Sequence, residues 1–159
     1  IDISQKNDEF DLTRLENNLI FNSKGELIHE IPPHHNGFGG AMATKDERYI
    51  GIFYGEDFFP GTSMVPKAGF VIFDKKLNKN IYGLRGGWGS IYVLSEIFIL
   101  RKGNHYKVIF PDMKVSYHRK LPKTDGLNLI KITKEGITRK VNGEIIFESF
   151  EEYFKREDF

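Results

Sequence analysis

The chain has 159 residues, of which 40% are hydrophobic and 28% are charged, and its net charge is +1. This length and composition predict a single folded domain, residues 1–159, and argue against an intrinsically disordered chain. The sequence holds no cysteine, which excludes disulfides, thiol nucleophiles and cysteine zinc sites, and no apolar run approaches the roughly 20 residues of a membrane-spanning helix. We therefore expect a cytoplasmic protein without a membrane partner.

The first third of the chain predicts short strands behind an N-terminal extension. Residues 1–16 are expected to form that extension, with a short helical turn at residues 8–16 that carries Phe10, Leu12 and Leu15. From Asn17 onward apolar and polar residues alternate, which is the period of a β-strand. The strands expected here are residues 17–22, 26–31, 38–44 and 48–54.

The same alternation continues after a long loop at residues 55–67, which contains two prolines. Asn142 and Gly143 both tolerate positive φ, so they predict a two-residue hairpin between the last two strands. The strands expected in this part are residues 68–74, 79–84, 88–94, 97–101, 106–110, 114–118, 127–133, 137–141 and 144–147.

The C-terminus changes from a strand pattern to a helix pattern. Ser149 and Glu152 have the spacing of a capping box, in which each side chain bonds to the backbone of the other residue. Phe150, Tyr153 and Phe154 have helical spacing, so residues 149–158 predict a short amphipathic helix. Its apolar face is expected to cover part of the sheet region formed by residues 17–147.

Two stretches of the chain repeat the same order of features. Phe21 and Phe73 each end an apolar triplet, and they are 52 residues apart. Phe38 and Trp88 each stand between glycines, in the sequences GFGG and GWGS, and they are 50 residues apart. Repeats of this length are typical of proteins built from similar sheet units.

This repeat resembles the blades of a β-propeller, in which four antiparallel strands form a unit and a glycine-rich step leads to the next unit. The resemblance implies a full blade over residues 38–84, the outer half of a preceding blade over 17–31 and most of the next blade over 88–118. The chain departs from WD repeats, because Phe73 and Asp74 stand where those repeats have Trp-Asp, and it has room for only about three to four blades. A β-sandwich is the alternative, so we expect an all-β, mostly antiparallel fold that is propeller-like or a sandwich, with one short C-terminal helix.

No sequence motif in the chain indicates catalysis. His34 and His35 are adjacent, so on an extended segment they point in opposite directions and do not chelate one metal ion. The glycine-rich stretch at residues 86–89 leads into a strand, whereas a phosphate-binding loop opens a helix. We expect no catalytic residue, no metal and no cofactor, although an enzyme of another type that uses the two histidines and the 55–67 loop is a third alternative.

The 55–67 loop has the composition of a protein-contact segment, with apolar anchors beside charged residues. Together with the adjacent histidines it supplies the expected partner-binding residues, which are His34, His35, Glu56, Asp57, Phe58, Phe59 and Met64.

Charge is distributed unevenly along the chain. Residues 101–140 hold eleven basic and three acidic residues, whereas residues 1–30 and 141–159 each have a net charge of −4. Basic residues interleaved with aromatic ones are what single-stranded nucleic acid binding uses, so this stretch is a possible patch for nucleic acid or an acidic partner. Its residues are Arg101, Lys102, Lys107, Lys114, Arg119, Lys120 and Lys123. Alternatively, the acidic ends of the chain fold back over the basic middle.

These features together indicate a protein that acts by binding another macromolecule, and they favour a protein as that partner. Small, cysteine-free bacterial proteins of irregular β fold that lack catalytic motifs are often immunity proteins, which bind and neutralise a toxin. By type, the chain is similar to such toxin inhibitors, with a toxin domain as partner. A nucleic-acid-binding β domain that uses residues 101–140 is the alternative.

Overall fold

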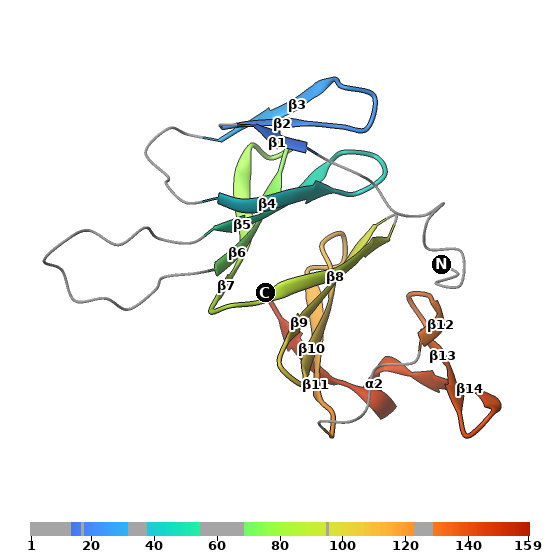
Figure 1. Ribbon diagram of the computed structural model, residues 1–159. Helices are drawn as coiled ribbons and strands as arrows, with labels where there is room; N and C mark the ends of the chain where they lie inside the picture. The colour runs from blue at the N-terminus through green and yellow to red at the C-terminus, as the bar shows by residue number, and fades with distance from the viewer. Residues whose placement is uncertain (1–13, 17, 32–37, 55–68, 95, 123–128) are drawn as a thin grey trace, which may run out of the picture. The chain divides into compact units, whose positions relative to one another are not determined.

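The computed structural model describes residues 14–16, 18–31, 38–54, 69–94, 96–122 and 129–159 (Figure 1). Within these ranges the strands form four antiparallel sheets, and one short helix lies near the C-terminus. The described residues up to Gly89 form one compact unit, the N-terminal unit, and those from Ser90 form a second, the C-terminal unit. Each unit has a buried core of its own, and the single domain expected from the sequence stays a prediction.

The N-terminal unit contains a three-stranded and a four-stranded sheet, each in sequence order. Ile20 and Ile28 of the first sheet, with Ile31 directly after its last strand, form one buried cluster with Ala43, Ile50 and Ile52 of the second sheet. Ile50 and Ile52 share a face because alternate residues of a strand point to the same side. The strands are β1 (Arg14–Glu16), β2 (Leu19–Phe21) and β3 (Leu27–Glu30), then β4 (Phe38–Ala43), β5 (Tyr49–Tyr54), β6 (Gly69–Asp74) and β7 (Lys79–Arg85).

The turns of this unit follow from short polar side chains and glycine. The side chain of Asn22 accepts hydrogen bonds from the backbone N–H groups of Lys24 and Glu26, and Gly25 adopts a φ of 80° that suits a residue without Cβ. Asp46 closes the next hairpin in the same way, by accepting from Arg48 N–H and from the hydroxyl of Thr44. The sequence predicts both turns, at residues 23–25 and 45–47, between the early strands.

One expectation for the N-terminal extension is wrong. Arg14–Glu16 was expected to belong to a helical turn, but it forms β1, and Leu15 pairs with Ile20 of β2. The reason is that an extended segment satisfies the outer backbone groups of β2, whereas a single helical turn has no such partner. Residues 8–13 lie outside the described residues.

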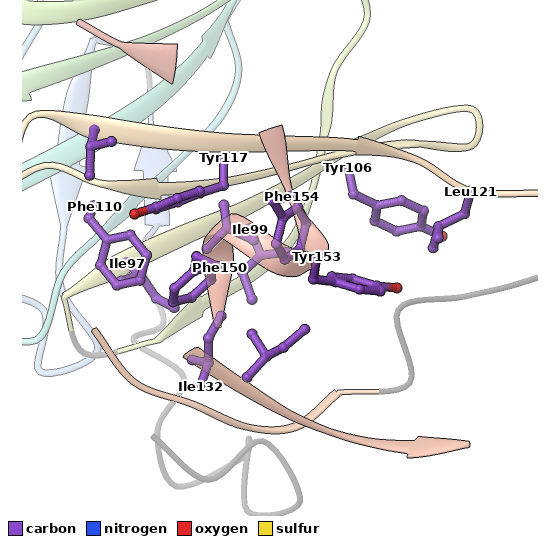
Figure 2. Packing of buried hydrophobic residues seen from close by; sticks show 13 residues of the cluster. Ile97, Ile99, Tyr106, Phe110, Tyr117, Leu121, Ile132, Phe150, Tyr153 and Phe154 are labelled. Atoms are coloured by element: carbon purple, nitrogen blue, oxygen red, sulfur yellow. The ribbon is translucent and has the colours of Figure 1, made fainter. Parts of the chain in front are cut away.

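The C-terminal unit contains a five-stranded sheet of order β15-β11-β10-β9-β8 and a three-stranded sheet of order β12-β13-β14. Residues from both sheets and from α2 (Phe150–Tyr153) form one core, which Figure 2 shows around the rings of Phe150, Tyr153 and Phe154. The strands are β8 (Gly89–Leu94), β9 (Ile97–Lys102), β10 (His105–Phe110), β11 (Val115–Lys120), β12 (Leu129–Ile132), β13 (Gly136–Val141), β14 (Glu144–Ser149) and β15 (Lys155–Asp158).

The C-terminal helix is present but much shorter than predicted. Ser149 caps it as expected, since its hydroxyl accepts a hydrogen bond from Glu152 N–H at 3.3 Å. The helix ends after Tyr153, and Lys155–Asp158 continues as β15 alongside β11, not as helix up to residue 158. A four-residue helix is poorly stabilised by its own hydrogen bonds, and the open edge of β11 offers a complete ladder instead.

The predicted fold class is confirmed as all-β and mostly antiparallel with one short C-terminal helix. The four-stranded unit expected over residues 38–84 corresponds to β4–β7, and both β4 and β8 begin a new sheet, where the Gly-aromatic-Gly sequences stand. Among the described residues the sheets close into neither a barrel nor a propeller. No helix in the same ranges is long and apolar enough to cross a membrane.

Candidate functional site

All seven of the partner-binding residues expected from the sequence lie outside the part of the chain that the structure describes. This holds for His34, His35, Glu56, Asp57, Phe58, Phe59 and Met64, and also for Lys123 of the basic patch. The remaining basic residues lie in the C-terminal unit, on β9, β10 and β11 or in the turn before β11.

The strand register divides the basic patch between two faces of one sheet. Lys102, His105 and Lys120 are directly opposite one another and share one face. Arg101 and Arg119 flank Tyr106 in the next row, which faces the opposite side because side chains alternate along a strand. The structure therefore brings only part of the expected patch together.

Arg119 takes part in packing. Its guanidinium lies 3.8 Å from the centre of the Tyr153 ring and donates a hydrogen bond to the carbonyl oxygen of Tyr153 at 2.9 Å. Arg139 of β13 also lies over this ring, at 4.0 Å, and forms an ion pair with Glu148 at 2.9 Å. These contacts hold α2 to both sheets, so Arg119 does not serve as a mobile ligand-binding cation.

Lys107 is buried and forms an ion pair with Glu157 of β15. Burial acts to raise the pKa of Glu157, but the hydrogen bond from Lys107 and the surrounding positive charges lower that pKa more, so the carboxylate stays ionised. The acidic C-terminal segment thus folds back onto the basic stretch, as the alternative interpretation of the charge pattern predicted. The N-terminal acidic residues before Arg14 lie outside the described part.

A histidine pair beside this ion pair was missed by the sequence reasoning. His105 Nδ1 and His118 Nε2 are 3.0 Å apart, and the two rings stack with 5.2 Å between their centres. Burial and the nearby Lys107 lower the pKa of His118, which favours the neutral ring. The signal in the sequence was the hairpin register. His105 pairs with Lys120 and Lys107 pairs with His118, so the two histidines are diagonal neighbours on the same face of β10 and β11.

The described residues hold no cluster of three or more His, Asp or Glu side chains that could bind a metal ion. A hollow of about 260 Å³ in the C-terminal unit is lined by Glu96, Phe110, Ile132, Thr133, Lys134 and Glu135. Lys134 pairs with Glu96 across 3.6 Å, and the Thr133 hydroxyl lies 3.5 Å from the carbonyl oxygen of Gly136. This lining places no activated nucleophile beside a base.

The most exposed large hydrophobic side chains of the described residues lie on β14. Ile145 is 67% exposed and Phe147 is 63% exposed, and both point to the same face of the strand. The opposite face of β14 turns toward the core, where Glu148 pairs with Arg139. The sequence signal was the apolar run Ile145-Ile146-Phe147 on the last strand of a hairpin, since alternation must leave two of the three on one face.

Three neighbours complete the surface around this pair. Lys140 is opposite Ile145, Thr138 is opposite Phe147, and Lys131 of β12 is opposite Thr138. A Cβ added at Gly136 would lie 2.8 Å from the tip of the Phe147 ring, so this ring rests over the glycine. We call Lys131, Thr138, Lys140, Ile145 and Phe147 the β14 surface.

The outer edge of β14 also presents backbone groups. The hairpin closes at Asn142 and Gly143, with φ of 50° and 83°, so Val141 and Glu144 form the hydrogen-bonded pair next to the turn. Because such pairs alternate along an antiparallel ladder, the N–H and C=O groups of Ile145 and Phe147 point away from β13. No strand of the described residues pairs with this edge.

No protein-family model, no curated protein and no solved structure matches this chain.

Proposed function

We propose that this chain is a non-catalytic, cytoplasmic protein-binding module whose binding site is the β14 surface. The observation that carries the proposal is the exposure of Ile145 and Phe147 side by side on an edge strand. Fully burying an exposed side chain of this size is worth about 1.5–3 kcal/mol, and a partner would cover the part of Ile145 and Phe147 that is still exposed. Adjacent exposed apolar residues on an open edge are typical of surfaces that contact another protein.

Within this function, the specific class that we propose is an immunity or inhibitor protein that binds and neutralises a bacterial toxin domain. The support is the combination of small size, absence of cysteine, β-rich fold and lack of a catalytic motif, which is an analogy of type. The 55–67 loop and the adjacent histidines, whose structure is not described, are proposed to belong to the same protein-binding function.

The proposal is tested by purifying tagged protein from its native cell with its bound partners. We expect one stoichiometric protein to accompany the wild type and to be lost from the double variant Ile145→Thr, Phe147→Ser. The matched control is Leu27→Ser with Leu77→Ser, which removes two exposed hydrophobics from the N-terminal unit and is expected to keep the partner. Equal capture by both double variants would contradict the β14 surface as the site.

The captured protein also tests the specific class. A partner that is toxic when expressed alone and harmless with this chain supports the immunity function. A partner that shows no toxicity in any assay of growth overturns that class while leaving the protein-binding function in place.

A nucleic-acid-binding function is the second candidate, and the row formed by Lys102, His105 and Lys120 favours it. Lys102 and Lys120 are exposed, and Arg101 lies one residue from Lys102 on the opposite face. We expect that binding of this kind weakens steeply with salt and is lost in Lys102→Glu, Lys120→Glu. Binding of single-stranded DNA that does not change with this double variant would contradict it.

A further inference from the structure

The outer edge of β14 has the geometry that accepts a further strand. Ile145 and Phe147 direct their N–H and C=O groups outward, and these groups are two residues apart, as on an unpaired sheet edge. An extended segment of a partner satisfies such groups by pairing with the strand. The open length runs from the turn at Gly143 to Ser149, where the chain enters α2.

The side chains of β14 alternate between two faces, and those of any strand added beside it alternate in the same way. Ile145 and Phe147 lie on the face of the β14 surface, whereas Glu144 and Glu148 lie on the opposite face. Residues directly opposite one another on neighbouring strands share a face. An added strand with apolar residues opposite Ile145 and Phe147 therefore places its neighbouring residues opposite Glu144, Ile146 and Glu148.

The two glutamates of this opposite face differ in how their charge is balanced. Glu148 forms an ion pair with Arg139 at 2.9 Å. Glu144 is exposed and lies opposite the uncharged Val141, and none of the described residues forms an ion pair with it. A basic residue directly opposite Glu144 is favourable, and an acidic one is destabilising. Lys140 belongs to the face of the β14 surface, so it points away from that basic residue.

Strand direction sets the order of residues in the added segment. Antiparallel pairing is slightly more stable per residue than parallel pairing. In this direction the residue opposite Ile145 comes two positions after the residue opposite Phe147, and the residue opposite Glu144 comes next. From its N-terminus, the segment that fits therefore has an apolar residue, any residue, a second apolar residue and a basic residue.

A second copy of this chain does not supply that order. In an antiparallel pairing that puts Ile145 opposite Phe147 of the second copy, Glu144 falls opposite Glu148 twice, and like charges directly opposite destabilise a sheet. In the next register Phe147 is opposite itself, but Ile145 then faces Ser149 and one apolar pair is lost. The charge pattern therefore favours a different protein over self-association.

We propose that the protein partner adds a strand to the edge of β14, through an extended segment with apolar residues opposite Ile145 and Phe147 and a basic residue opposite Glu144. This inference rests on the proposed function, because it specifies how the protein-binding module recognises its partner. Backbone pairing provides affinity for extended segments in general, and the apolar and basic side chains select among them.

The free protein gives the first test through hydrogen exchange of individual amides. The amides of Ile145 and Phe147 are expected to exchange rapidly, whereas the amide of Ile146, which faces Arg139 in the ladder, exchanges slowly. Slow exchange at Ile145 and Phe147 in the free protein would mean that this edge is already occupied, which overturns the proposal.

The second test compares two synthetic peptides of eight residues with blocked ends. The lysine peptide has two isoleucines that are separated by one threonine and followed by lysine, with serine and threonine elsewhere. The glutamate peptide has glutamate in place of that lysine. We expect the lysine peptide to bind at least about threefold more tightly at 0.1 M salt, because repulsion at Glu144 replaces attraction in the glutamate peptide. It should also slow amide exchange at Ile145 and Phe147, and equal binding of the two peptides overturns the proposal.

Methylated peptides separate strand addition from simple apolar contact. In the paired lysine peptide the N–H groups of both isoleucines face β14, whereas that of the threonine between them faces solvent. Methylating both isoleucine nitrogens should weaken binding at least about tenfold, and methylating the threonine nitrogen should change it by less than about twofold. Equal binding of the two methylated peptides overturns strand addition.

Charge reversal at Glu144 provides a variant that is expected to keep the fold, because this side chain is exposed and directly follows the turn at Gly143. Glu144→Lys is expected to reverse the preference, so that the glutamate peptide binds more tightly than the lysine peptide. A Glu144→Lys protein that keeps the wild-type preference overturns the assignment of a basic residue to the partner.

The matched control is Glu135→Lys, which makes the same change of charge at an exposed position just before β13. Glu135 lies about 20 Å along the strand from Val141, which is opposite Glu144. Charges on the surface are largely screened beyond about 10 Å at 0.1 M salt. This control should therefore keep the wild-type preference, and a reversed preference would show that net charge, not pairing at Glu144, selects the peptide.

The outcomes separate this inference from the proposed function. If the lysine peptide does not bind, or binds equally to Ile145→Thr with Phe147→Ser, strand addition at this edge is wrong, while co-purification still decides whether the β14 surface binds a protein. A concentration-dependent dimer in sedimentation, lost in the same double variant, would show that the occupant is a second copy and would also overturn the inference.

Discussion

Two edge strands of the C-terminal unit, β14 and β15, differ in what they present. All four residues of β15 are charged, and it covers the side of β11 with an ion pair from Glu157 to Lys107. β14 has two exposed hydrophobic side chains beside its outward backbone groups. Charged edge strands resist pairing with other chains, whereas apolar edges favour it. Both strands lie at an edge of a sheet, so the chemistry of their side chains distinguishes the edge that resists pairing from the edge that favours it.

The largest expected difference in stability is between removing the buried ring of Phe150 and removing the exposed ring of Phe147. Phe150 is 1% exposed and packs 4.5 Å from the Tyr117 ring and 5.3 Å from the Phe110 ring. Phe150→Ala should lower the free energy of unfolding by about 3–5 kcal/mol, and Phe147→Ala by less than about 1 kcal/mol. Urea unfolding measures both, and equal losses would show that Phe147 is buried in solution.

The second largest effect on stability is expected at Gly136 of β13, which lies against the backbone of β14. A Cβ at position 136 would lie 2.3 Å from the carbonyl oxygen of Glu148, which is rigid backbone of the paired strand. Gly136→Ala should therefore destabilise the unit by about 1–3 kcal/mol and displace Phe147. Gly83→Ala is the control, because no atom lies within 4 Å of a Cβ built there. Equal stability of the two variants would contradict the tight approach of β13 and β14.

The free energy of unfolding is expected to depend on pH through His118 of β11, the strand that β15 covers. Burial and Lys107 hold the pKa of His118 below the ordinary histidine value of about 6.5. The unfolded chain then binds a proton before the folded one, so the free energy of unfolding falls as pH drops below about 6.5. His29 contributes in the same direction, since burial and Lys75 lower its pKa.

Urea unfolding between pH 7.5 and 5.5 measures this response. His118→Gln should reduce the loss of stability across that range. Glu157→Gln should make the loss across this range larger, because the negative charge of Glu157 raises the pKa of His118. The stability that Glu157 contributes through its own lowered pKa is present above about pH 4.3 and is lost only at more acidic pH. If His118→Gln loses as much stability across this range as the wild type, His118 is not the group responsible for the pH dependence.

The smallest effects on stability are expected from single exposed residues of the two edge strands, β14 and β15. Ile145→Thr on β14 and Lys155→Ala on β15 should each change the free energy of unfolding by less than about 0.5 kcal/mol, because both side chains are exposed. Only Ile145→Thr should reduce capture of the partner. Loss of capture with Lys155→Ala would place the binding surface on the charged edge instead.

The strands were predictable from the sequence because their residues alternate and their turns use Asn, Asp and Gly. The hairpin at Asn142 and Gly143 and the turn after Asn22 are local features, and the structure has both. β1 and β15 were not predicted. The three residues Arg14–Glu16 are too few to establish an alternation, Lys155–Asp158 has none, and both segments become strands through the edges that they cover. Such pairing depends on tertiary structure, not on local propensity.

The candidate site was less predictable than the fold. The basic stretch was visible as a charge pattern, but its division between two faces follows from the register of β10 with β9 and β11. In the sequence Lys107 and Arg119 look like exposed cations that could bind a ligand. In the structure Lys107 forms an ion pair with Glu157, and Arg119 donates a hydrogen bond to the carbonyl oxygen of Tyr153. Ile145 and Phe147 resembled core residues in sequence, and only the edge position of β14 leaves them exposed.

The chain has a single tryptophan, Trp88, which lies between β7 and β8, where its backbone N–H donates to the carbonyl oxygen of Gly86 at 3.0 Å. Its fluorescence therefore reports on the N-terminal unit at the point where that unit ends. Three of the seven tyrosines of the chain, at positions 106, 117 and 153, belong to the core of the C-terminal unit and contribute to the near-ultraviolet circular dichroism. The two optical signals will show whether both units lose structure at one denaturant concentration, as a single cooperative domain must.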